Sequence, residues 1–404
     1  MIRHYLKLIW NRKRSNLLIM VEILLSFLVT FAVVTLGIHG ADNYRRPLGY
    51  AWQDTWNVEV NTRAGILADD AIPPELLETA RQVFAAVREF PEVVAAGGAG
   101  SAPYGFSEWT ASSNIGNWYL KYGVNQVTDG FAEALDLRLT RGRWFDSRDD
   151  GAAWLPVVIN ERLAHEIFGD RDPVGNSVPQ ERNRDGSFDP EQRIIGVVTD
   201  FRQNGEFSPP QNYLFRRHRL NEGEQRPPAN LLLRLRPGTT AAFEERLVKR
   251  LQAVAPEWSF EVKPLAQMRE TRFTLVLAPL IGAGVVAGFL LLMVAMGLTG
   301  VLWQTVTQRT REIGLRRAKG ATAGDIRAQI LGELVVMTSL AVAAGAAIVL
   351  QFPLLKLTGL VNNGVYVVSL VVSAACIYLL TIACAWYPSR LATTMTPAAA
   401  LHYE

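Results

Sequence analysis

The charged side chains with the greatest capacity for specific recognition lie in residues 309–327, between two long apolar stretches. Guanidinium groups alternate there with carboxylates and glycines, an order that a merely basic loop would not need. Because charge is costly in hydrocarbon, this segment must lie outside the lipid. Its candidate site residues are Arg309, Arg311, Glu312, Gly314, Arg316, Arg317, Gly320 and Asp325.

Motifs for catalysis are absent from the sequence. No G-x-x-x-x-G-K-[ST] phosphate loop occurs, so no such cradle for nucleotide phosphates is present. His165-Glu166 lacks the second histidine four residues on that a helical zinc site requires. Cys376 and Cys384 are the only cysteines and lie in the last apolar stretch. We therefore expect no catalytic, cofactor or metal site, and no enzyme activity from this chain by itself.

A glycine pattern in the second apolar stretch allows two interpretations. Gly282-x-Gly284-x-x-x-Gly288 resembles a dinucleotide loop, but a pyrophosphate could not enter an apolar span. Small residues spaced by four let helices approach closely in a membrane. We therefore predict that Gly284 and Gly288 form a helix-packing face, and that the run 341–347 does the same in the third span.

Four stretches reach the roughly 20 apolar residues that a membrane helix needs. Cations precede the first stretch and follow the second, whereas the loop 351–365 carries only Lys356, so both termini should be cytoplasmic. The predicted order is an interfacial helix (1–15), span one (16–38), an external domain (39–272), span two (273–302), an inner segment (303–327), span three (328–350), an outer loop (351–365), span four (366–387) and a cytoplasmic tail (388–404).

Two acids lie near the ends of the predicted spans, Glu22 in the first and Glu333 in the third. A carboxylate inside hydrocarbon is costly unless it is paired or protonated. Each should therefore face another helix or the inner interface, and a structural role is favoured over proton relay.

Residues 39–272 are long enough to bury their own core, and they mix short strands with helices. The predicted fold class is a membrane α-helical protein of four transmembrane helices, with a large extracytoplasmic α+β domain inserted between the first two. Residues 179–191 and 203–228 are polar and rich in Gly, Pro and Asn, which indicates loops. The predicted strands are 56–60, 93–97, 121–127, 157–159, 193–199, 231–236 and 259–262, and the predicted helices are 74–90, 129–135, 161–168 and 240–255.

The overall charge does not indicate a nucleic-acid partner. The formal net charge is +3 over 404 residues, and membrane topology explains where the cations lie. We expect contact with membrane lipid and none with nucleic acid.

Several motifs together resemble the MacB/FtsX-like permeases of ABC transporters. Arg311–Ala318 with Gly320-Ala321-Thr322 resembles the segment after that family's second span, and Thr396–Glu404 resembles its C-terminal tail. Lys319 and His402 depart from the commoner residues of the family. The external motifs that extend the resemblance are Gly142–Phe145, Val157–Glu161, Phe168–Gly175 and Ile195–Val198.

The resemblance implies a multi-pass permease of the bacterial inner membrane that pairs with a separate cytoplasmic ABC ATPase and a second permease copy, identical or not. ATP-Mg would be bound by the ATPase, and a periplasmic membrane-fusion protein is a further candidate partner. The segment 303–327 would seat a coupling helix in the ATPase. Movement of the spans would then rearrange the external domains and drive efflux by mechanotransmission.

Two other functions stay open at this point. The chain could be an FtsX-like regulator of an envelope hydrolase, or a permease for lipoprotein release. For the inner segment, the alternative is an ordinary positive-inside loop, which explains the cations but not the ordered Glu312, Gly314, Gly320 and Asp325.

Overall fold

The computed structural model describes residues 13–62, 73–115, 118–180, 190–220, 226–308, 310–354 and 362–394. They divide into two compact units, one of 1–42 with 276–404 and one of 43–275. Residues 1–12 of the predicted interfacial helix (1–15) and the tail motif at 396–404 lie outside the described residues.

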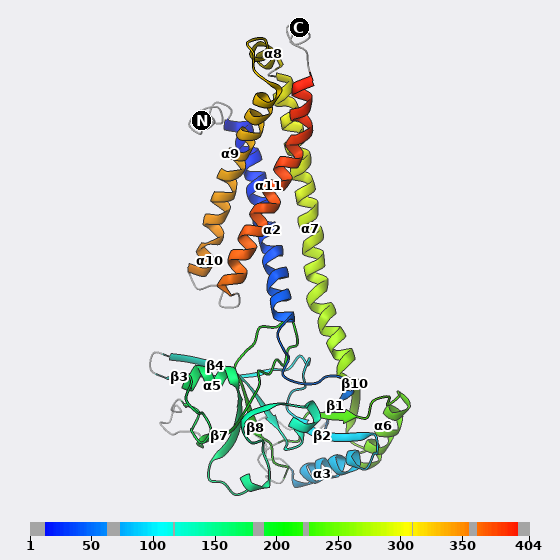
Figure 1. Cartoon of the computed structure of the whole chain (residues 1–404). Coiled ribbons are helices and arrows are strands. Elements are labelled where there is room, and N and C mark those ends of the chain that lie inside the picture. The colour runs from blue at the N-terminus through cyan, green and yellow to red at the C-terminus, as the bar shows by residue number, and fades with distance from the viewer. Residues whose placement is uncertain are drawn as a thin grey trace. The chain divides into compact units, whose positions relative to one another are not determined.

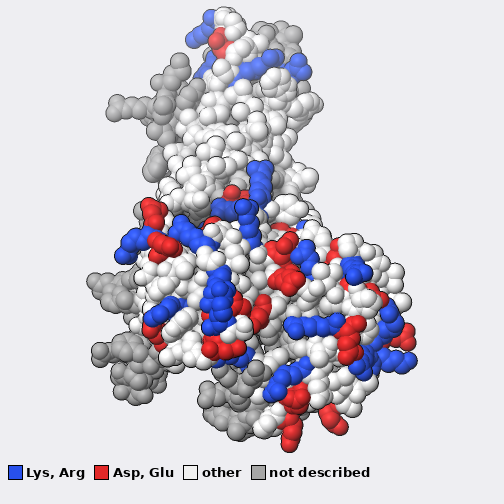
Figure 2. Space-filling view, turned by 60° about the horizontal axis from the view of Figure 1, so that its bottom comes forward, with Lys and Arg blue, Asp and Glu red and all other residues white. Residues whose placement is uncertain are grey.

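Four helices of the described chain are long and apolar enough to cross a membrane (Figure 1). They are α2 (Lys13–Tyr44), α7 (Leu265–Gln308), α9 (Ala323–Val349) and α11 (Asn363–Thr394). Their unit shows a broad surface without charged side chains (Figure 2). With its 44 residues, α7 is about 66 Å long, more than twice a bilayer's hydrocarbon thickness. This helix therefore extends well beyond the lipid.

The described helices of the bundle pack through an apolar core around Ile23, Phe27, Leu298 and Met337. Hydroxyl groups add hydrogen bonds between α9 and α11. Thr338 Oγ1 donates to Thr381 Oγ1 at 3.3 Å, and Ser339 pairs with the Tyr378 hydroxyl at 2.8 Å. Short α10 (Gln351–Leu354) follows α9.

In the described residues the second unit contains one ten-stranded sheet, ordered β10-β1-β9-β2-β4-β8-β6-β7-β5, with β3 paired to β4. The pairs β4·β8 and β6·β7 are parallel and the other pairs antiparallel. The strands are β1 (Thr55–Asn61), β2 (Val93–Ala99), β3 (Trp109–Ile115), β4 (Trp118–Val127), β5 (Leu139–Gly142), β6 (Leu155–Asn160), β7 (Gln192–Val198), β8 (Tyr213–Arg217), β9 (Asn230–Leu235) and β10 (Ser259–Pro264).

Helices cover the sheet in two places (Figure 1). A core of Val58, Leu233, Phe84 and Leu247 joins β1 and β9 to α3 and α6, and a second core around Ile159 and Leu163 holds α5 against β6. The helices of this unit are α3 (Pro74–Arg88), α4 (Phe131–Leu135), α5 (Glu161–Phe168) and α6 (Ala242–Val254).

The predicted loop 203–228 is wrong in its middle part. Residues Tyr213–Arg217 form β8, which lies inside the sheet between β4 and β6. Tyr213, Leu214 and Phe215 are each 0% exposed. Because both faces of β8 are covered, its sequence lacks the alternation of polar and apolar residues that signals a strand. Two further strands, β3 and β5, were also not predicted.

Candidate functional site

The charged segment predicted to recognise a partner forms a short helix, α8 (Thr310–Ala318), followed by a tight turn into α9. Ile313 of α8 packs against Val306, near the end of α7, and Ile326, in the first turn of α9. The two partners are each only 4% exposed. The helix is thus held against both of its neighbours in sequence by a small apolar cluster.

The turn after α8 fixes the direction in which α9 begins. Gly320 has φ +100°, a left-handed conformation that favours glycine. Thr322 Oγ1 accepts a hydrogen bond from the Asp325 N–H at 3.2 Å, and Asp325 Oδ2 accepts one from the Thr322 N–H at 2.9 Å. This reciprocal capping box stabilises the start of α9.

A chain of polar contacts runs from α8 along α9. Arg316 Nη1 donates to Gln329 Oε1, and Gln329 Nε2 donates to Glu333 Oε1 at 3.2 Å. Of the two acids near the predicted span ends, Glu333 is therefore hydrogen-bonded to its own helix. The contacts fasten α8 to α9 by side chains as well as by the turn.

The other predicted coupling residues have different surroundings. Arg309 lies outside the described residues, as do the side chains of Arg311, Glu312 and Arg317, although their backbone belongs to α8. Gly314 is buried. That these residues contact an ATPase stays a prediction. The structure shows that those at positions 310–318 belong to the helix α8.

The predicted glycine face of α7 is open in the described chain. A Cβ built at Gly284 or Gly288 meets nothing within 4 Å, so a role in packing would need a surface outside the described residues. Close approach occurs elsewhere in the bundle. A Cβ at Gly345 would lie 2.5 Å from the Phe27 ring, and one at Gly297 would lie 2.9 Å from a carboxylate oxygen of Glu22. Glu22 thus faces another helix, as predicted.

A second candidate site, which the sequence did not reveal, lies where the external unit holds the end of α2. Arg202 follows β7 and is 1% exposed. Its Nη1 donates to the carbonyls of Asn43 and Arg46, both at 2.9 Å, and its Nη2 to those of Glu206 and Ser208. Burial lowers the pKa of this guanidinium, but four carbonyl acceptors surround the charge.

The same loop also holds the start of α7. Arg269 Nε donates to Glu206 Oε1 at 2.5 Å, and the guanidinium lies 4.3 Å from the centre of the Phe273 ring. Phe273 packs on Phe207 at 4.9 Å and on Tyr44 at 6.1 Å between ring centres. We call this set the junction cluster: Asn43, Tyr44, Arg202, Glu206, Phe207, Arg269 and Phe273.

The junction cluster joins residues 43–46 to residues 269–273 through the loop 201–208. Its members come from three distant parts of the chain, which are the end of α2, the loop 201–208 and the start of α7. In the sequence, the feature that these contacts leave is an aromatic residue beside an arginine, at Phe201-Arg202 and at Arg272-Phe273. A force on the end of α2 or the start of α7 would act directly on this loop.

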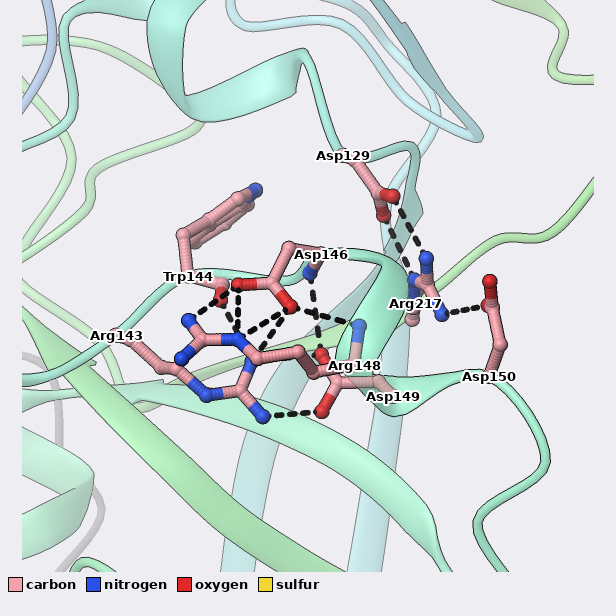
Figure 3. Close-up of polar contacts among 8 residues, drawn as sticks. All are labelled: Asp129, Arg143, Trp144, Asp146, Arg148, Asp149, Asp150 and Arg217. Carbon is pink, nitrogen blue, oxygen red and sulfur yellow. Dashed lines mark hydrogen bonds and ion pairs between the residues drawn. The ribbon is translucent and has the colours of Figure 1, made fainter.

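The external motifs serve the fold (Figure 3). Arg143 of the Gly142–Phe145 motif donates to both carboxylate oxygens of Asp149, which is 1% exposed. Burial by itself raises the pKa of Asp149, but the hydrogen bonds and charge of Arg143 outweigh it and hold that pKa below its usual value. Nearby, Arg217 donates to Asp129 at 2.7 Å and to Asp150 at 2.6 Å.

Another external motif ends in a buried helix cap. Asn160 is 0% exposed, accepts a hydrogen bond from the Leu163 N–H at 3.1 Å and begins α5. It also accepts from the Tyr213 N–H at 3.0 Å, which connects β6 to β8. In the part of the chain that the structure describes, no group of three or more His, Cys, Asp or Glu side chains could hold a metal ion.

Comparison with known protein families gives two matches. Residues 17–250, more than half of the chain, match the model of the MacB-like periplasmic core domain. Residues 284–397 match the model of the FtsX-like permease C-terminal domain. The first match covers most of α2 and of the external unit, and the second covers α7 from residue 284 onward together with α8, α9 and α11.

Curated proteins with similar sequences are transport proteins by name. The chain is 26% identical over 290 residues to the pyoverdine export ATP-binding/permease protein PvdT of Pseudomonas aeruginosa, which covers 70% of this chain and 42% of that protein. It is 27% identical over 318 residues to the macrolide export ATP-binding/permease protein MacB of Bdellovibrio bacteriovorus, covering 71% and 45%. The ABC transporter permease YknZ of Bacillus subtilis is 27% identical over 235 residues, covering 56% and 55%. The chain spans about half the length of these relatives.

Solved structures similar to the external unit include the periplasmic region of MacB from Actinobacillus actinomycetemcomitans. It has 14% sequence identity and a TM-score of 0.35, and covers 55% of this chain and 92% of that one. The extracellular domain of YknZ has 12% identity and a TM-score of 0.32, and covers 51% and 99%.

Proposed function

The chain belongs to the MacB/FtsX-like family of ABC transporter permeases, and from that premise we propose that it couples ATP hydrolysis on a separate ATPase chain to rearrangement of its external domain. Export is the favoured outcome, because two of the relatives are named for macrolide or pyoverdine export. Regulation of an envelope hydrolase and lipoprotein release are the alternatives that this proposal sets aside.

The attachment of α8 to both neighbouring helices is the observation that carries the proposal. Ile313 packs against Val306 and Ile326, and Arg316 is hydrogen-bonded to Gln329. A helix held in this way moves together with the ends of α7 and α9 when a partner displaces it. A flexible topogenic loop would take up the same displacement without passing it on.

At the other end of α7 the junction cluster supplies a point where movement can enter the external domain. Arg269 and Phe273 lie in α7, while Asn43 and Tyr44 end α2. Both pairs contact the loop 201–208. We propose that a relative shift of α2 and α7 acts on the sheet through this loop, since the loop lies between β7 and β8.

A second permease copy is proposed to cover the open face of α7. Ile281, Val285 and Phe289 are 64%, 68% and 62% exposed in the single chain, next to the open Gly284 and Gly288. Small residues among large apolar ones suit close contact between membrane helices. We further propose that the termini and α8 are cytoplasmic in the inner membrane, because cations gather there.

The chain by itself should neither bind nor hydrolyse ATP, and this can be measured directly. We expect the purified chain to show no saturable nucleotide binding, and ATP hydrolysis to be found only when a second, ATP-binding chain copurifies with it. Saturable binding by the chain alone would refute the division of labour that we propose.

A further inference from the structure

A cavity in the external unit has walls of two different kinds. Its volume is about 420 Å³, within the range of small-molecule sites. One wall is the face of β1 and β10 that points away from α3 and α6. The opposite wall consists of the segment 100–107 and the first turns of α7 at Gln267, Met268 and Thr271.

The strand wall contains two amide side chains that are joined by hydrogen bonds. Asn57 Nδ2 donates to Asn230 Oδ1 at 3.0 Å, and Asn230 Nδ2 donates to the Gly100 carbonyl at 3.0 Å. This relay fixes the orientation of both amides. Asn57 is 2% exposed, and its Oδ1 receives no hydrogen bond from any described residue. This acceptor is itself covered, whereas the Glu59 carboxylate on the same wall is exposed.

The charge of this wall favours a cation. Glu59 lies two residues along β1 from Asn57, lines the cavity and is exposed. Its neighbour on β10 is another acid, Glu261. Lys263 also lines the cavity, and it pairs with Glu261 at 2.6 Å. That pair leaves one net negative charge at Glu59, which no described Lys or Arg side chain pairs with.

The opposite wall carries two apolar side chains and is held in place. Phe106 is 74% exposed, and Met268 lies beside the cavity as well. The Arg272 guanidinium lies 4.4 Å from the centre of the Phe106 ring, and its Nε donates to the Tyr104 carbonyl at 2.9 Å. The aromatic surface is therefore fixed before any ligand arrives, which lowers the entropic cost of binding.

We propose that this cavity binds an amphiphilic organic amine. The ammonium group lies at Glu59, while the apolar part of the ligand packs on Phe106 and Met268. The proposal goes beyond the coupling function and depends only on the external unit, so it stands even if α8 contacts no ATPase. Because α7 forms one wall, occupancy of the cavity and the position of the first turns of α7 would affect each other.

Two fluorinated probes of the same shape test the proposal with the full chain in lipid nanodiscs. One is 4-(trifluoromethyl)benzylamine, and the other is its neutral counterpart, 4-(trifluoromethyl)benzyl alcohol. Binding is measured by the broadening of the ¹⁹F NMR signal, with empty nanodiscs as the baseline for partition into lipid. We expect the amine to bind more tightly than the alcohol.

Four variants make the result specific. Glu59→Gln should weaken amine binding up to about fivefold, the scale of an exposed ion pair, and leave the alcohol unchanged. Phe106→Ala should weaken both probes. Gln267→Glu adds an acid to the cavity wall and should tighten amine binding. This variant tests the proposal by adding a contact, whereas the other two remove one. The control Glu245→Gln, on exposed α6, should change neither probe.

Equal binding of the two probes would overturn the proposal. It would also be overturned if Glu59→Gln acted but Phe106→Ala did not, because the amine would then be held only by surface charge. The same holds if Glu245→Gln weakened the amine as much as Glu59→Gln. None of these outcomes bears on ATPase recruitment, so the two proposals fail independently.

Discussion

Arg269 Nε donates a 2.5 Å hydrogen bond to Glu206 Oε1, and this contact joins the start of α7 to the loop that also holds the end of α2. The Glu206 side chain is 8% exposed and that of Arg269 24%. The loop lies between two strands of the sheet, β7 and β8. The ends of two membrane helices are therefore fastened to one short segment of the external unit.

Arg269→Gln should loosen the loop 201–208 without unfolding the sheet. Removing one partner of a largely buried ion pair costs about 1–3 kcal/mol where water still reaches part of it. Hydrogen exchange should become faster in residues 201–208 and stay unchanged in β1 and β9. The control Arg250→Gln breaks the exposed pair with Glu89 and should leave exchange in the loop unchanged. Equal effects of the two variants would contradict the role given to this contact.

Gly345→Val should destabilise the helical unit, because a Cβ there lies 2.5 Å from the Phe27 ring. Overpacking of this kind costs about 1–3 kcal/mol. The matched variant Gly284→Val meets nothing within 4 Å in the single chain and should leave its thermal unfolding unchanged. If Gly284 packs against a second copy, that variant should instead lower the dimer fraction seen by light scattering. Equal loss of thermal stability in both variants would argue against the packing described here.

The Arg143–Asp149 pair should make the external unit sensitive to acid. The pKa of Asp149 is lower in the folded chain than the ordinary unfolded value near 3.9. Its stabilisation is thus fully present above about pH 4 and is lost as the pH falls through the lower, folded value. We expect the protection of amides 139–150, expressed relative to the intrinsic exchange rate at each pH, to fall below about pH 4.

Asp149→Asn should remove much of that acid dependence and make exchange faster at neutral pH. The exposed Asp170→Asn is the control and should keep the response of the unmodified chain. An unchanged acid response in Asp149→Asn would show that other groups control the stability of this region.

Membrane topology can be tested after Cys376 and Cys384 are replaced by serine. A cysteine at Glu257, in the external unit, should react with an impermeant thiol reagent in intact spheroplasts, and one at Gln308, at the end of α7, should not. The reason is the excess of Arg and Lys beside Gln308, which retains that end in the cytoplasm. Reversed labelling would remove α8 from the reach of a cytoplasmic ATPase.

The sequence was most informative where one physical effect acts alone. The apolar spans follow from length, and α5 was predicted with its observed bounds. In the structure Asn160 caps this helix, Leu163 and Ala164 are buried, and Gly169 ends it. β8 was missed because burial on both faces removes the alternation that marks a strand.

The junction cluster could not be predicted because it depends on tertiary contact. Arg202 is separated from Asn43 by 159 residues. Its four acceptors are backbone carbonyls, which every residue has, so the sequence of side chains does not indicate them. The coupling segment is the opposite case. Its charges were visible in the sequence, but the contacts of Ile313 and Arg316 that make it a fixed helix were not.

Copurification of an ATPase with the Glu312→Lys variant tests the coupling role of α8 most directly. The change leaves a cluster of one sign on α8, and like charges across an interface can cost several kcal/mol, whereas a surface substitution usually alters folding by under about 0.5 kcal/mol. Glu245→Lys on α6 is the matched charge reversal away from α8. We predict normal membrane abundance for both variants, with the ATPase lost only from Glu312→Lys. Full ATPase recovery with Glu312→Lys, together with unchanged transport activity, would mean that α8 serves membrane topology alone.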